Sequence, residues 1–149
     1  MTWHETWRRG VSASRTGLGG LHLGVAIVSF LRPNLALIVP SYAGFHAIMP
    51  TIFWGVTALT IALGLLLIPR GKPLLILWQF ASAVFFILFS ILVTQGPYGL
   101  TWGSVVYGGL GLWSCVLAYY TADDWFWHNR WPQRFRVWLT KCWGHRGRS

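Results

Sequence analysis

His22 and His46 offer the most versatile chemistry in this sequence, because an imidazole can ligate haem iron or carry a proton. His22 lies in the apolar stretch between Arg15 and Arg32, whereas His46 lies in a proline-containing connection. An isolated polar group in an apolar helix usually bonds to a neighbouring helix. We therefore treat both histidines as weak candidates for a cofactor site and expect no bound cofactor.

The sequence lacks the other arrangements of residues that usually carry out chemistry. The long apolar segments contain no Asp or Glu, so the buried carboxylate on which ion coupling usually relies is missing. There is no Ser-His-Asp set, H-E-x-x-H, C-x-x-C or phosphate-binding loop. Cys115 and Cys142 lack the spacing of metal ligands. The sequence therefore predicts a protein that is not an enzyme, with no catalytic residue and no metal.

The composition points to a lipid bilayer as the surroundings of these residues. Hydrophobic residues make up 54% of the 149 residues and charged residues 10%, against about 25% charged residues in soluble domains. We predict an all-α integral membrane protein built as an antiparallel four-helix bundle. The expected spans are about residues 12–31, 51–68, 74–94 and 100–120. They define a transmembrane domain at 16–120, between an N-terminal arm at 1–15 and a basic, Trp-rich tail at 121–149.

The distribution of positive charge predicts the orientation. All but one of the 12 Lys and Arg residues fall in the N-terminal arm, the turn at 69–73 and the tail, and the exception is Arg32. Positively charged segments stay cytoplasmic. We therefore expect a multi-pass protein of the inner (plasma) membrane with both termini in the cytoplasm. The connection at 32–50, which contains three prolines, would lie at the outer interface or re-enter the membrane.

Small residues at four-residue spacing suggest close contacts between helices. Gly20 and Gly24 form one such pair, and Ser104 and Gly108 form another, followed by Gly111. Small residues let helix backbones approach in lipid. The contacts would lie within one bundle, between copies of the chain, or with another membrane subunit.

The tail has the pattern of a helix that lies flat on a membrane surface. One helical face carries aromatic and aliphatic residues and the other carries basic residues, a pattern that favours anionic inner-leaflet lipids over nucleic acid. The residues assigned to this surface are Arg134, Phe135, Arg136, Trp138, Leu139, Lys141 and Trp143. Before it, Thr121 and Asp124 have the spacing of a helix cap, with Thr121 as the N-cap.

Three functions remain open at this point. The first is a small bacterial or phage-encoded membrane protein that acts by assembly in the bilayer, with a holin-like pore former as its sharpest version. Holins are short, have few spans and end in a basic cytoplasmic tail, and this chain is similar in that outline. The second is an accessory subunit of a larger membrane complex. The third is a haem- or cofactor-binding membrane protein that uses His22 and His46. It has the least support, because the apolar segments contain no second histidine to pair with His22 and no carboxylate.

Overall fold

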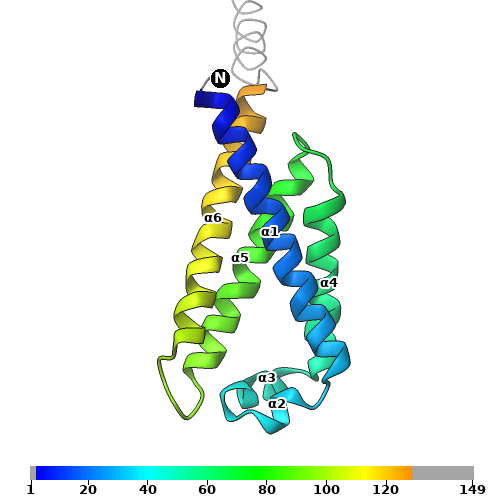
Figure 1. Ribbon diagram of the computed structural model, residues 1–149, viewed down its shortest axis with the longest axis vertical. Coiled ribbons are helices and arrows are strands. Elements are labelled where there is room, and N and C mark those ends of the chain that lie inside the picture. The colour runs from blue at the N-terminus through cyan, green and yellow to red at the C-terminus, as the bar shows by residue number, and fades with distance from the viewer. Residues whose placement is uncertain (1–2, 129–149) are drawn as a thin grey trace, which may run out of the picture.

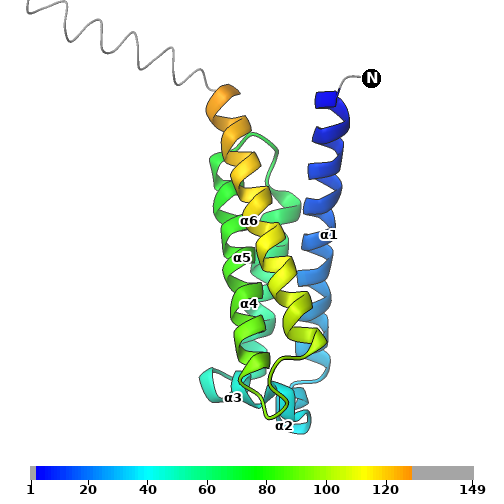
Figure 2. The ribbon, with the colours of Figure 1, turned by 90° about the vertical axis from the view of Figure 1, so that its left-hand side faces the viewer.

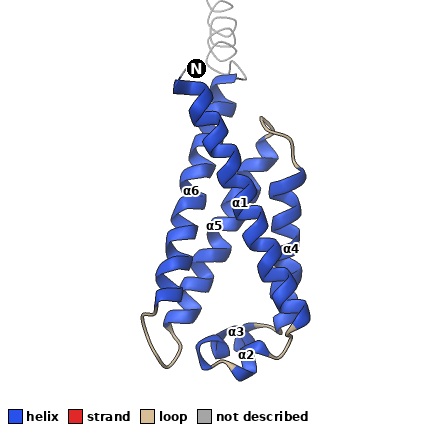
Figure 3. Cartoon of the chain, in the orientation of Figure 1, coloured by secondary structure: helices blue, strands red, loops and turns tan. Residues whose placement is uncertain are grey.

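The computed structural model describes residues 3–128, and it describes side chains for residues 10–35 and 37–126. Every regular element in this part of the chain is helical, which confirms the all-α prediction (Figure 3). In chain order the elements are α1 (Trp3–Leu31), α2 (Leu35–Ile38), the 3₁₀ turn η1 (Pro40–Tyr42), α3 (Ala43–Ile48), α4 (Thr51–Leu67), α5 (Pro73–Thr94) and α6 (Trp102–His128).

Proline and glycine set the boundaries of the central helices. Pro50 is the N-cap of α4, and Pro73 occupies the first turn of α5, where its missing N–H costs no hydrogen bond. Between them, Gly71 has a φ of +79°, which favours glycine in the tight turn. The turns at 69–73 and 95–99 therefore lie where the sequence predicts them.

Two helices extend beyond the predicted spans. α1 begins at Trp3, ahead of the span predicted from about residue 12, and α6 continues through Thr121 to His128. No new helix starts at Thr121, because the backbone N–H groups that a cap would satisfy are already bonded within α6. A capping sequence is therefore harmless inside a helix and does not by itself start one.

Among the residues that the structure describes, two helices are long and apolar enough to cross a membrane, rather than the four spans that the sequence predicts. They are α5 and the Trp102–Phe126 part of α6, and a third span results if Pro40–Ile48 and α4, which meet at 83°, count as one broken span. α4 alone has 17 residues, about 26 Å against a hydrocarbon core of about 30 Å. The N-terminal part of α1 is polar, which lowers the average hydropathy of that helix.

The four long helices form two closely packed pairs, α1 with α4 and α5 with α6 (Figures 1 and 2). Glycine permits the close approach in each pair. A Cβ atom added to Gly55 of α4 would lie 2.9 Å from Cβ of Ser29 on α1, and one added to Gly111 of α6 would lie 2.7 Å from Cγ1 of Ile87 on α5. The short helices α2 and α3 lie at the end opposite the N-terminus (Figure 1).

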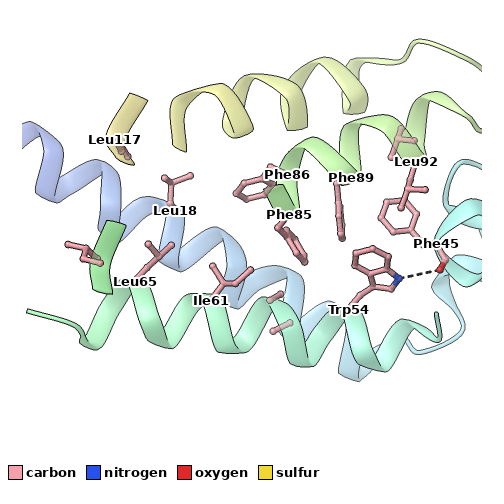
Figure 4. Packing of buried hydrophobic residues seen from close by; sticks show 14 residues of the cluster. Leu18, Phe45, Trp54, Ile61, Leu65, Phe85, Phe86, Phe89, Leu92 and Leu117 are labelled. Atoms are coloured by element: carbon pink, nitrogen blue, oxygen red, sulfur yellow. Dashed lines mark hydrogen bonds between the residues drawn. The ribbon is translucent and has the colours of Figure 1, made fainter. Parts of the chain in front are cut away.

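Aromatic side chains fill the space between the two pairs. Phe89 of α5 lies at the centre, stacked on Phe85 with ring centroids 4.4 Å apart and edge-on to Phe45 at 4.5 Å. Trp54 of α4 packs against the same rings and donates a hydrogen bond of 3.2 Å from Nε1 to the carbonyl oxygen of Phe45 (Figure 4). Rings of this size bury a large apolar area and hold the pairs apart at a fixed spacing.

Candidate functional site: a polar cluster inside the helical bundle

His22 is fully buried in the interior, 0% exposed, and faces away from the lipid side of α1. Its ring lies against two rings of α5, with centroid distances of 4.9 Å to Phe85 and 4.5 Å to Phe86. Nε2 is 2.8 Å from the Oγ atom of Ser82, which lies one turn earlier on α5. His22 therefore joins the α1/α4 pair to the α5/α6 pair through a polar contact in an otherwise aromatic interface.

The hydrogen bonds run in one direction from His22 to α6. Ser114 donates to the carbonyl oxygen of Leu110 at 2.9 Å, so its only proton is used. Ser82, whose Oγ is 3.1 Å from that of Ser114, must then be the donor in their contact. With its own proton used, Ser82 can only accept from His22. This order places a proton on Nε2 of His22 and leaves Nδ1 of the neutral ring as a bare acceptor.

Several buried polar atoms near this chain of hydrogen bonds lack a partner among the described residues. They are Nδ1 of His22, both Oε1 and Nε2 of Gln79, and Nε of Arg15. Gln79 is 0% exposed and lies one turn before Ser82 on α5. An unpaired buried polar atom costs about 1–3 kcal/mol, and hydrocarbon offers no substitute partner. The cluster is therefore the most polar and the least satisfied part of the interior.

The cluster does not have the arrangement of a nucleophilic site. A serine hydrolase needs a histidine that accepts the serine proton and a third group that orients the histidine. Here Ser82 donates to Ser114 instead, and Nδ1 of His22 contacts no orienting group within the described residues. The same part of the chain contains no group of three or more His, Cys, Asp or Glu residues that would hold a metal.

The two histidine candidates occupy different environments. His46 is exposed on α3, whereas His22 is enclosed between α1, α5 and α6, and no contact in the described part of the chain joins them. The structure therefore does not bring the two imidazoles together. Gln79, Ser82 and Ser114 belong to the site but were not predicted. Gln79 and Ser82 lie three residues apart in an uncharged segment, a spacing that puts both on one helical face and that signals an inward-facing polar pair.

The predicted small-residue positions divide into two groups. Gly108 and Gly111 face α5, and Ser104 is buried, donating to the carbonyl oxygen of Thr101 at 2.7 Å and accepting from its N–H at 2.9 Å. Gly20 and Gly24 instead point outward, and a Cβ atom on either would meet nothing within 4 Å. The first group packs within the bundle, and the second makes no contact in a single copy of the chain.

A substitution at Gly111 should report the close approach of α5 and α6. Gly111→Ala puts a methyl group 2.7 Å from Ile87 Cγ1 and 3.3 Å from the backbone atoms Ala83 O and Ile87 N, which cannot move away easily. We expect a loss of about 1–3 kcal/mol in the free energy of unfolding, as for other overpacked sites. Unfolding in mixed micelles measures it.

Gly109→Ala is the matched control, because this glycine lies on the same helix and its Cβ would have nothing within 4 Å. It should keep or slightly raise the stability, since alanine favours a helix over glycine. Equal losses at Gly109 and Gly111 would contradict the described packing of α6 on α5.

The predicted membrane-surface residues of the tail lie outside the described residues. They are Arg134, Phe135, Arg136, Trp138, Leu139, Lys141 and Trp143. Their assignment stays a prediction.

Comparison of the chain with models of known protein families, with characterised proteins and with solved structures finds no match.

Proposed function

We propose that the chain crosses the inner membrane four times with both termini in the cytoplasm. The start of α1, the α4–α5 turn and the end of α6 lie at one end of the bundle (Figure 1). These are the parts of the chain next to all the Lys and Arg residues except Arg32. Arg15, at that end of α1, donates a hydrogen bond of 3.1 Å to the carbonyl oxygen of Ile68, which lets α1 carry a charge near the interface.

Within that membrane we propose that the protein acts by assembling with further copies of itself. The observation that carries this proposal is the outward face of α1. Exposed residues follow one another there at alternating steps of three and four. They are Gly10, Ala13, Gly17, Gly20, Gly24, Ile27 and Leu31.

Lipid covers such a face poorly. Glycine and alanine offer little side chain to acyl chains, whereas a second helix can approach them closely and gain van der Waals contact. A repeat of three and four residues keeps the same face toward a partner helix over several turns. The most favourable occupant of this face is therefore α1 of another copy.

The most specific form of this proposal is a holin-like pore made of several copies of the chain. The interior of each copy is filled by the aromatic rings around Phe89, so a pore would have to form between copies rather than through one. An accessory subunit would use the same face for a different membrane protein. The two alternatives differ in what lies next to α1, and copurification separates them.

Replacing Gly20 and Gly24 together with leucine should abolish self-assembly while each copy stays folded. Both positions are exposed and have open space around a Cβ atom, so the new side chains would not disturb a single copy. They would hold two α1 helices apart. The measurement is the mass of the purified protein in a mild detergent, together with the leakage of a dye from vesicles that contain it.

Gly109→Leu is the matched control, since this glycine is also exposed but lies on α6. It should leave the oligomer and any leakage unchanged. A wild-type protein that runs as a single copy, or one that always brings an unrelated chain, would refute self-assembly and favour the accessory subunit.

A further inference from the structure

The partnerless polar atoms around His22 lie at three successive depths of the bundle. Gln79 precedes Ser82, the partner of His22, by one turn, so it lies about 4.5 Å closer to the end that holds the α4–α5 turn. Arg15 precedes His22 by two turns on α1, about 10 Å closer to the same end. All three residues have partnerless atoms that are shielded by protein.

Beyond His22 the character of the interior changes. Toward the α2–α3 end, the next layers are the rings of Phe85, Phe86 and Phe89, followed by Phe45 and Trp54. The buried Nε1 of Trp54 has its partner in the carbonyl oxygen of Phe45. One further partnerless atom, Oγ1 of Thr51, belongs to the first residue of α4, at the far end of the bundle. The unsatisfied atoms around His22 therefore lie on the side of the α4–α5 turn, where the buried neighbours are the leucines Leu18, Leu65 and Leu117, whereas aromatic rings fill the other side (Figure 4).

The chemistry of these atoms specifies their ligand. Nδ1 of His22 and Oε1 of Gln79 need a hydrogen-bond donor, whereas Nε2 of Gln79 and Nε of Arg15 need an acceptor. A single species that both donates and accepts, carries no charge and fits between helices is water. Buried water commonly makes about three hydrogen bonds to groups of this kind.

We propose that water enters the bundle from the end that holds the α4–α5 turn, binds Arg15 and Gln79, and stops at Nδ1 of His22. These waters would form a hydrated passage through half of the bundle, closed beyond His22 by the rings of Phe85, Phe86 and Phe89. The inference is independent of self-assembly, because it uses only the inward face of α1.

Water-edited solid-state NMR of the full chain in lipid vesicles tests the proposal. In this measurement, polarisation starts on water protons and spreads to nearby nitrogens. The ring of His22 and the carboxamide of Gln79 should receive it early. The indole nitrogen of Trp54, which is also buried but bonded to protein, is the internal control and should receive it late. If His22 and Gln79 are as slow as Trp54, the passage is dry and the proposal is overturned.

Two variants on opposite sides of His22 test the route. Gln79→Leu removes the polar step on the entry side and should abolish the early transfer to His22. Ser29→Ala removes a buried hydroxyl two turns away on the other side and should leave the transfer unchanged. The reverse result would mean that water arrives from the α2–α3 end, which overturns the route. The comparison of His22 with Trp54 needs no variant, so misfolding of Gln79→Leu would not prevent the test.

Discussion

Replacing His22 with alanine should lower the free energy of unfolding by about 2–4 kcal/mol, the range of large-to-small substitutions in packed cores. The ring fills the space beside Phe85 and Phe86 and is fully buried, so its removal leaves a cavity at the junction of three helices. The variant also removes the donor to Ser82. Unfolding by increasing amounts of a denaturing detergent, followed by Trp fluorescence, measures the change.

Two further variants separate packing from hydrogen bonding. His22→Leu keeps most of the volume and loses only the bond to Ser82, so we expect a loss of about 1 kcal/mol or less, in line with hydrogen bonds inside membrane proteins. His46→Ala is the control, because that histidine is exposed on α3, and it should change stability little. Similar results for His22→Ala and His46→Ala would contradict the burial of His22.

The positions of α4 and α5 follow from the sequence, because prolines and apolar runs act locally. Pro50 and Pro73 lie at the starts of α4 and α5, where proline is tolerated, and Pro69 follows the end of α4 because it cannot continue a helix. The ends of α1 and α6 depend on more distant effects. Residues 3–11 and 121–128 contain charged side chains but still continue α1 and α6, so hydropathy alone does not give the length of a helix.

The direction of a glycine face is harder to predict than its existence. α1 has glycines on more than one side. Gly19 faces Leu66 of α4, whereas Gly20, the next residue, faces outward. A rotation of about 100° per residue separates the two, and the sequence does not state which side meets α4. Gly55, which packs against Ser29 and Phe30 of α1, was not among the predicted packing residues.

The polar cluster could not be predicted from the sequence, because its residues come from three different helices. The sequence identifies His22 as the ionisable group of the first apolar segment, but Ser114 lies far along the chain, in the last helix. Only the packing of α1 against α5 and α6 brings the imidazole to Ser82 and Ser114. The direction of the hydrogen bonds, and with it the unpaired lone pair of the buried Nδ1 atom of His22, follows from the bond of Ser114 to its own helix.

Reporter fusions should show a complete change of signal between the two ends of the bundle. A reporter active only in the cytoplasm should work after Gly71, in the α4–α5 turn, and after Ser149. A reporter active only outside should work after Gly44 and after Pro97. The physical reason is the charge distribution, since moving clustered Arg and Lys residues across the bilayer is strongly disfavoured.

Each fusion site carries its own control, because both reporters can be placed there and only one should be active. The site after Gly71 is the most informative. If α4 is too short to cross, as its 17 residues alone suggest, the α4–α5 turn would stay on the same side as α3. Gly71 and Gly44 would then give the same signal. Opposite signals at these two sites require the chain between them, which contains α4, to cross the membrane. The same signal at both would reduce the protein to fewer spans and remove the common cytoplasmic end on which the proposed orientation depends.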